Sequence, residues 1–211
     1  MVKQKKHVKK RTVKKTSKKN NQLEQHNRIL KGIFGIFIVF AILIGGYYTL
    51  SSYISNFTYE GVDFEIVKEG ELIFYKTSLP VIYQDESREY DFYLRNDPRK
   101  LVNIQFYGQL HLIENMVLNA TASFNCEGDG PIAIANLVNL YNIMGAKIIR
   151  DENATCYSGM EYSLVNIQPG NTTYIDKTDD ACYQMYINDC EILEATERFM
   201  VQTLVELQTI L

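Results

Sequence analysis

Residues 32–50 read GIFGIFIVFAILIGGYYTL, nineteen positions without one charged side chain. A helix that rises about 1.5 Å per residue would extend about 28 Å over this stretch, close to the roughly 30 Å of a bilayer's hydrocarbon core. The stretch therefore predicts a transmembrane helix. The residues on its two sides differ in charge and in cysteine content, so the helix divides the chain into two parts that face different compartments.

The two flanking segments carry opposite net charge. Residues 1–31 hold twelve Lys or Arg and a single acid, Glu24, whereas residues 51–211 hold ten Lys or Arg and twenty-four Asp or Glu. The formal charges are thus +11 and −14. Basic residues close to a membrane span stay on the cytoplasmic side. We therefore expect the N-terminus inside the cell and residues 51–211 outside.

Two other interpretations of the apolar stretch exist. A cleaved secretory signal has a hydrophobic run of about 7–15 residues followed by a small-x-small site. Here the run is longer, and Gly45-Gly46-Tyr47-Tyr48 offers no such site, which favours an uncleaved signal-anchor. Lys31-Gly32 is similar to the processing site of archaeal type IV pilin precursors, so a pilin-like subunit is the second alternative. Pilin helices usually continue beyond the membrane, whereas strand-like sequence starts here by about Tyr53.

The basic segment 1–31 has no apolar periodicity and predicts a disordered cytoplasmic tail. Its basic residues are attracted to anionic lipid headgroups, or they serve only to set the topology. Nucleic acid is not favoured as a partner, because no aromatic residue is interleaved with the charges to stack on bases.

Residues 51–61 predict a short stalk that holds the outer part close to the bilayer, and residues 62–211 predict one extracytoplasmic domain. The first half of this domain alternates apolar and polar residues, with turn signals between the runs, which is typical of antiparallel strands joined by tight turns. The expected strands cover residues 62–66, 72–76, 81–83, 90–94, 102–106 and 111–124.

The second half of the domain changes to helical periodicity. Residues 131–144 predict a helix, with Pro131 at its first position and Gly145 just past its end. A closing helix is expected over residues 191–211, with Glu194, Glu197, Arg198 and Gln202 outside its apolar stripe. Further strands fit residues 147–150, 162–167 and 182–188. The order strand, helix, strand within 115–150 indicates a parallel crossover. The fold class is α+β: an antiparallel and mixed sheet covered by two helices.

All four cysteines, Cys126, Cys156, Cys182 and Cys190, follow the apolar stretch, which predicts disulfides in an oxidising compartment. Four cysteines allow three pairings. Cys126 and Cys190 each lie where a predicted strand gives way to a helix, and parallel neighbouring strands would bring such ends together. The pairing Cys126 with Cys190 and Cys156 with Cys182 is therefore preferred. Metal binding is not favoured, since there is no Cys-x-x-Cys pair and the outer part has only His111.

Four Asn-x-Thr sequons, at Asn56, Asn119, Asn153 and Asn171, can carry N-glycans if the host glycosylates. Asn119 lies in a predicted strand, so Asn56, Asn153 and Asn171 are the expected glycosylation sites.

The segment 126–130, CEGDG, leads into the first helix of the outer domain. A glycine-rich turn before a helix can bind an anion, but Glu127 and Asp129 would repel one and favour either helix capping or a cation. Asp189 would join them if the disulfide pairing is right. The sequence contains no nucleophile with a histidine and an acid, no phosphate-binding loop and no zinc-protease motif. No cofactor is expected.

Three segments carry a family resemblance: YLRNDPRK at 93–100, CEGDG at 126–130 and CEILEATERF at 190–199. They resemble segments of uncharacterised single-pass membrane proteins of small-genome archaea. The resemblance implies an archaeal envelope protein and transfers no catalytic residue.

These observations favour a binding or structural module of the cell envelope, whose partner is another envelope protein or a surface glycan. Fifteen tyrosines support this interpretation, because tyrosine supplies amphipathic contact area at low entropy cost. The alternative is an extracytoplasmic hydrolase that cleaves glycans with acidic residues such as Glu127, Asp129 and Asp189.

Overall fold

The computed structural model describes residues 30–47, 55–83, 86–111, 113–156 and 161–210. The predicted cytoplasmic tail up to residue 29 and the stalk residues 51–54 lie outside the described residues. The chain forms two units, which meet in sequence at Ile54 and Ser55, and each unit is described by itself.

The described residues of the first unit form one helix, Leu30–Tyr47, which begins two residues ahead of the predicted start. Its 18 residues have a mean hydropathy of 2.1 and none of them is buried within the structure. At about 1.5 Å per residue the helix is roughly 27 Å long. By length and composition it can cross a membrane.

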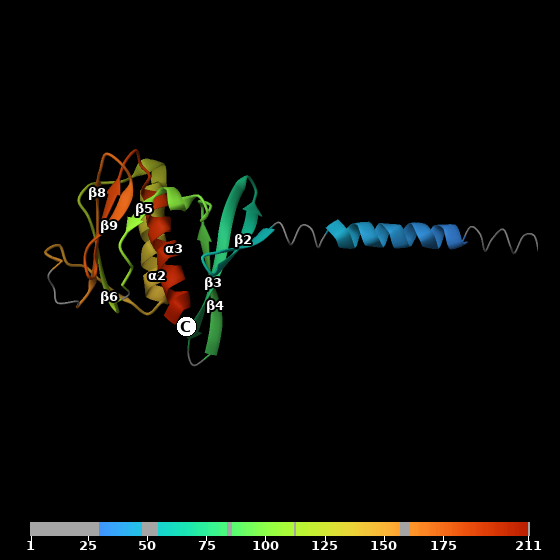
Figure 1. The fold of residues 1–211 in the computed structure, drawn as a ribbon, viewed down its shortest axis with the longest axis horizontal. Coiled ribbons are helices and arrows are strands. Elements are labelled where there is room, and N and C mark those ends of the chain that lie inside the picture. Colours follow the sequence, from blue (N-terminus) through green and yellow to red (C-terminus); the bar gives the residue numbers. More distant parts are fainter. Residues whose placement is uncertain (1–29, 48–54, 84–85, 112, 157–160, 211) are drawn as a thin grey trace, which may run out of the picture. The chain divides into compact units, whose positions relative to one another are not determined.

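A four-stranded antiparallel sheet opens the second unit (Figure 1). Its strands follow each other in chain order and pair as a meander. Side chains at alternate positions of β2 and β4, such as Val62, Phe64, Phe92 and Leu94, are buried, as the period-two pattern predicts. The strands are β1 (Asn56–Tyr59), β2 (Val62–Glu69), β3 (Leu72–Tyr83) and β4 (Glu86–Leu94).

Strand β1 lies within the segment that was expected to be a stalk. Phe57 of β1 stacks on Phe64 of β2 with ring centroids 5.5 Å apart, and the Arg99 guanidinium lies 4.1 Å from the Phe57 ring centroid. The turn to β2 uses Glu60 and Gly61, both with positive φ, as a two-residue hairpin requires. The sheet begins at Asn56, because the packing of Phe57 holds this segment against β2.

Strand β3 continues through Pro80, although two separate strands, 72–76 and 81–83, were predicted here. Strand β2 pairs with β3 only up to Lys76, so Pro80 lies in a part of β3 that pairs with β4 alone. A proline, which has no N–H to donate, is tolerated at such an open edge.

A six-stranded mixed sheet follows, in the order β5-β9-β10-β8-β6-β7. All its neighbouring pairs are parallel except β9 with β10. Strands β6 and β7 flank helix α2 in the chain, so the predicted parallel crossover is present. The elements are η1 (Leu101–Asn103), β5 (Gln105–Tyr107), β6 (Asn115–Ala120), η2 (Cys126–Gly128), α2 (Asp129–Ile143), β7 (Lys147–Ile149), β8 (Ser163–Pro169), β9 (Tyr174–Asp179), β10 (Cys182–Ile187) and α3 (Ile192–Ile210).

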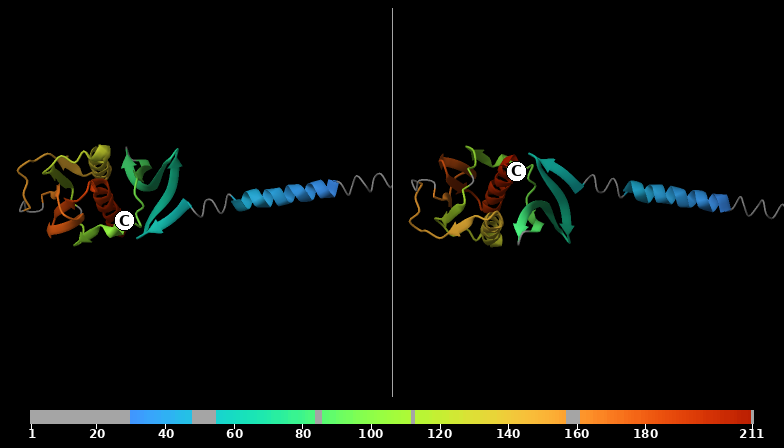
Figure 2. Two further views of the ribbon diagram at one scale, coloured as in Figure 1. Left: turned by 90° about the horizontal axis from the view of Figure 1, so that it is seen from above. Right: turned by 90° about the horizontal axis from the view of Figure 1, so that it is seen from below.

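Helices α2 and α3 lie between the two sheets, as Figures 1 and 2 show from different sides. One core joins all three layers: it contains Phe64 and Leu94 from the first sheet, Leu137 and Phe199 from the helices, and Ile167 from the second sheet. The α+β class is therefore confirmed, but the strands form two sheets with the helices between them rather than one sheet that the helices cover.

The position of α3 between two sheets explains why one prediction about this helix was wrong. Glu197 and Arg198 were placed on the solvent side of the helix, yet they are 0% and 9% exposed. The Glu197 carboxylate accepts hydrogen bonds from the backbone N–H groups of Arg95 and Asn96, at 2.7 and 2.9 Å, and from Asn96 Nδ2 at 3.0 Å. A helix between two sheets has little solvent-facing surface, so Glu197 binds buried backbone groups instead, whereas Nε and Nη1 of the buried Arg198 have no hydrogen-bond partner among the described residues.

Candidate functional site

The two faces of the six-stranded sheet differ in chemistry. On β8, Val165 and Ile167 point into the core, and Asn166 and Gln168 point the opposite way. On β10 the core-facing residues Tyr183, Met185 and Ile187 likewise alternate with Gln184 and Tyr186. Since α2 and α3 pack on the core side, the face that carries the amides and tyrosines is not covered by these helices (Figure 1).

Strand register assembles this face into two rows. The amide row crosses five neighbouring strands, because each of its members is the Cα partner of the next. It consists of Asn119 on β6, Asn166 on β8, Gln184 on β10, Asp176 on β9 and Tyr107 on β5.

The tyrosine row lies beside it, two residues further along β8 and β10. It consists of Gln168 on β8, Tyr186 on β10, Tyr174 on β9 and Gln105 on β5. We call the nine residues of the two rows the open face. Each of them is half-buried or exposed.

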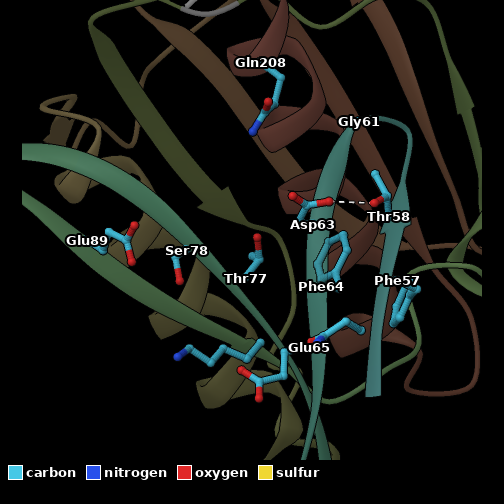
Figure 3. A pocket seen from close by; sticks show the side chains of 12 residues that line it. Phe57, Thr58, Gly61, Asp63, Phe64, Glu65, Thr77, Ser78, Glu89 and Gln208 are labelled. Atoms are coloured by element: carbon cyan, nitrogen blue, oxygen red, sulfur yellow. Dashed lines mark hydrogen bonds between the residues drawn. The ribbon is translucent and has the colours of Figure 1, made fainter. Parts of the chain in front are cut away.

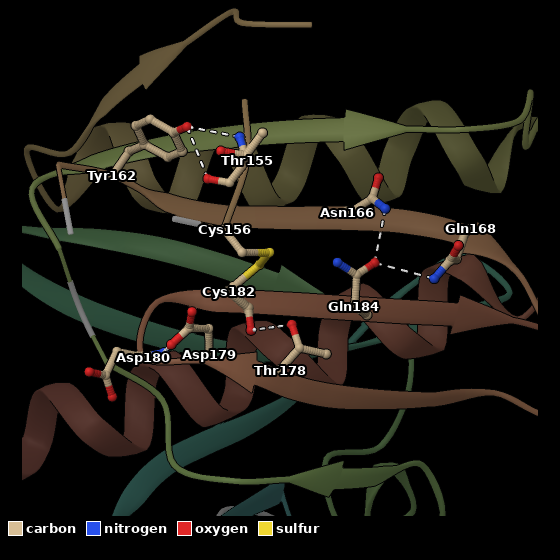
Figure 4. Close-up of a disulfide and its surroundings, with 10 residues drawn as sticks. All are labelled: Thr155, Cys156, Tyr162, Asn166, Gln168, Thr178, Asp179, Asp180, Cys182 and Gln184. Atoms are coloured by element: carbon tan, nitrogen blue, oxygen red, sulfur yellow. Dashed lines mark hydrogen bonds between the residues drawn. A yellow bond between two sulfur atoms is a disulfide. The ribbon is translucent and has the colours of Figure 1, made fainter. Parts of the chain in front are cut away.

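The amides hold one another in place, as Figure 4 shows. Asn166 Nδ2 donates to Gln184 Oε1 at 2.9 Å, and Gln168 Nε2 donates to the same oxygen at 3.2 Å. Each amide carries both a donor group and an acceptor. Among the described residues, Gln184 Nε2 and Asn166 Oδ1 have no partner, so the network fixes the side chains and leaves hydrogen-bonding capacity for a ligand.

The tyrosines form an aromatic cluster next to the amides. Tyr174 stacks on Tyr186 with ring centroids 4.5 Å apart, and Tyr107 meets Tyr174 edge to face at 6.0 Å. Burial raises the pKa of Tyr174, and its interactions with Tyr186, including a hydrogen bond, add to this effect. Tyr107 is 53% exposed, so the cluster presents a ring to solvent.

A disulfide lies alongside the amide row, two residues before Gln184 on β10. Cys156 is bonded to Cys182 at the start of β10, with Cα atoms 5.4 Å apart (Figure 4). This bond fastens the segment after β7 over the small cluster of Val117, Leu164 and Cys182. Between that segment and the sheet lies a cavity of about 450 Å³, within the range of small-molecule sites. Its lining includes Asn119, Asn166, Gln184, Thr121, Glu152 and Thr155.

The other disulfide joins Cys126 to Cys190, again with Cα atoms 5.4 Å apart. Both pairs are those preferred from the sequence. Cys126 and Cys190 follow β6 and β10, which run in the same direction, but β8 lies between these strands. The bond therefore ties the starts of η2 and α3 together across one intervening strand.

The three carboxylates considered for a cation do not form a shared site. Asp129 Oδ1 pairs with Arg95 Nη1 at 3.1 Å, and Asp189 Oδ2 accepts a hydrogen bond from Asn188 Nδ2 at 2.9 Å. Glu127 is exposed, in the left-handed turn that precedes α2. No group of three or more acidic, histidine or cysteine side chains within the described ranges is placed to hold a metal ion.

The expected glycosylation sites Asn56, Asn153 and Asn171 are exposed. Asn119 is half-buried in β6, and its Nδ2 donates to the Asp151 carbonyl at 3.3 Å. A glycan on Asn119 would displace this bond and enter the amide row.

A second polar cavity, of about 620 Å³, lies beside the four-stranded sheet (Figure 3). Several of its polar groups bind within the sheet: Thr58 Oγ1 donates to Asp63 at 2.6 Å, and Lys76 pairs with Asp91, which lies outside the lining, at 2.9 Å. A hydrogen bond from Ser78 and the Lys76 interaction hold the pKa of Asp91 below its usual value. Thr58, Asp63, Lys76 and Ser78 are thus already paired, and no tyrosine is among the described residues that line the cavity, which makes the open face the stronger candidate site.

Comparison with known proteins places the chain in no family. No family model, no curated protein and no solved structure matches it. The function must therefore be argued from the site itself.

Proposed function

We propose that this protein is anchored in the cell membrane by the helix Leu30–Tyr47, and that its C-terminal unit is a binding module outside the cytoplasm. The length and hydropathy of the helix support the anchor. The basic segment before it and the acidic segment after it support the orientation. The two disulfides support an oxidising compartment, because disulfides persist outside the cytoplasm.

The observation that carries the binding function is the open face. Two rows of polar and aromatic side chains lie in register across the sheet, and the described helices pack on the opposite face. Cross-strand pairs of this kind also stabilise a sheet, but here Gln184 Nε2 and the exposed ring of Tyr107 remain available to a partner. The partner is a component of the cell envelope, either a surface glycan or another protein.

A hydrolase receives less support. None of the three cavities found beside β1–β3, β6 and α2 is lined by Glu127, Asp129 or Asp189. Asp129 is in an ion pair with Arg95, which reduces its availability as an acid or base. The three carboxylates named for the glycan-cleaving alternative are thus not placed across any of these cavities.

Photo-crosslinking in intact cells tests the binding function. A photoreactive residue replaces Tyr107 on the open face or, as a matched control, Tyr93 on the four-stranded sheet. The two tyrosines are similarly exposed, at 53% and 43%. Light should produce adducts with envelope material from position 107 and few from position 93. Equal yields at the two positions, or none at 107, would contradict the proposal.

A further inference from the structure

We infer that the open face binds a neutral carbohydrate chain. This inference rests on the proposed binding function and names the chemistry of its ligand. Four properties of the face support it: its charge, its hydrogen-bonding groups, its exposed aromatic rings and its dimensions.

The charge of the face selects against anionic ligands. The nine residues include one carboxylate, Asp176, and no lysine, arginine or histidine. Recognition of phosphate, sulfate or nucleic acid depends on basic side chains, which form charge-assisted bonds to the anion. A neutral ligand therefore suits this surface best.

The hydrogen-bonding groups match hydroxyls. A sugar hydroxyl both donates and accepts, so it is best satisfied by a group that does both. The amides of Asn166, Gln168 and Gln184 offer this, and the carboxylate of Asp176 accepts two further bonds. The core of a protein interface is instead depleted of charged residues, and Asp176 lies within the amide row, so the row suits a polyol better than a protein partner.

The tyrosine rings provide the apolar part of the contact. One face of a pyranose ring presents C–H groups, which pack against the electron-rich face of an aromatic ring. Tyr107 is the most exposed ring of the cluster, and Tyr174 and Tyr186 extend it across two more strands. Tyrosine suits this task because little side-chain entropy is lost when its ring is covered.

The dimensions fit a chain rather than a single sugar. The amide row crosses five strands, and four spacings of about 4.8 Å give roughly 19 Å. Three residues of the row, Asn119, Asn166 and Gln184, line the cavity of about 450 Å³ beneath the Cys156 segment. The wall formed by Glu152 and Thr155 would enclose the terminal units, while the rest of the chain lies over Asp176 and the tyrosines.

Calorimetric titration of the full chain in lipid nanodiscs tests this inference. The probes are neutral oligosaccharides of glucose, mannose, galactose or N-acetylglucosamine, N-glycans released from glycoproteins, and heparin as an anionic control. We expect binding to at least one neutral probe and none to heparin. Binding to a simple oligosaccharide would indicate that the natural ligand is an envelope polysaccharide. Binding only to the N-glycans would indicate that it is a glycoprotein.

Two variants and a control locate the site. Tyr107→Ala and Gln184→Ala should each weaken binding about tenfold, the effect of losing one stacking or hydrogen-bonding contact. Tyr93→Ala, on the other sheet, should bind as the parent does. The inference is wrong if no neutral probe binds, if heparin binds more tightly, or if both open-face variants retain full affinity. Specific crosslinks from position 107 without saccharide binding would indicate a protein partner, and would leave the proposed function standing.

Discussion

Glu197→Ala is expected to lower the free energy of unfolding by about 3 to 5 kcal/mol at pH 5. The substitution removes the acceptor for two backbone N–H groups, those of Arg95 and Asn96, and for the Asn96 side chain. An unsatisfied buried donor costs about 1 to 3 kcal/mol. These bonds tie the segment after β4 to the middle of α3, so their loss loosens the contact between the first sheet and the helices.

The loss should depend on pH. Burial raises the pKa of Glu197 from 4.5 to about 7, because desolvation outweighs the hydrogen bonds it accepts. The unfolded chain releases this proton near pH 4.5, whereas the folded protein holds it until about pH 7. Between these values the unfolded state binds fewer protons, so stability falls as pH rises, by up to about 3 kcal/mol. The stability of Glu197→Ala does not decline in this way. The difference in free energy of unfolding between this variant and the parent protein should therefore shrink between pH 5 and pH 8.

Urea unfolding of the full chain in detergent, followed by the near-ultraviolet circular dichroism of its tyrosines, measures both effects. The control is Glu206→Ala, a half-buried acid later on α3 that does not contribute to the Glu197 pKa shift, which should change stability by less than about 0.5 kcal/mol. Equal effects of the two substitutions, or a deficit that grows from pH 5 to pH 8, would contradict the assigned role of Glu197.

Removal of the Cys126–Cys190 disulfide by a double substitution to serine should cost about 4 kcal/mol. The bond closes a loop with a sequence separation of 64, and the chain-entropy estimate for such a loop gives this value. That is a large share of the 5 to 15 kcal/mol typical of a folded domain. The same unfolding experiment measures it, with alkylation to confirm that the parent protein has no free thiol.

The other disulfide provides the comparison. Cys156 and Cys182 are separated by 26 residues, so their loss should cost less, about 3.5 kcal/mol. It should also weaken ligand binding, since the bond holds the wall of the open-face cavity. Cys126 and Cys190 do not line that cavity, and their loss should leave affinity unchanged. Unaltered stability without Cys126–Cys190 would show that the bond is not structural.

Local patterns in the sequence were sufficient to predict most elements. The alternation of apolar and polar residues predicted the positions of β2, β4, β8 and β10. The helical periodicity, together with Gly145, predicted both ends of α2 to within two residues. Strand β9 was missed, because its residues, YIDKTD, show little apolar alternation. The prediction that Glu197 lies away from the buried side of α3 was wrong for a different reason. Periodicity identifies the apolar stripe of a helix, but it does not reveal that a second sheet packs on the remaining surface.

The open face could not be predicted as a site. The alternation in LVNIQ at 164–168 and in CYQMYI at 182–187 does show that amides and a tyrosine share one side of each strand. Their assembly depends on the strand order β9-β10-β8-β6, in which residues far apart in the chain become neighbours. The disulfide argument predicted the right pairs although it assumed neighbouring strands: β6 and β10 run in the same direction with β8 between them, and the segments that follow them still meet.

The central claim is that a membrane helix anchors the chain with its C-terminal unit outside the cytoplasm. Protease treatment of intact cells and of inverted vesicles, with a different cleavable tag at each end of the chain, tests it most directly. External protease should remove the C-terminal tag from intact cells and spare the N-terminal one, and inverted vesicles should show the opposite pattern. Loss of the N-terminal tag alone from intact cells would contradict the account.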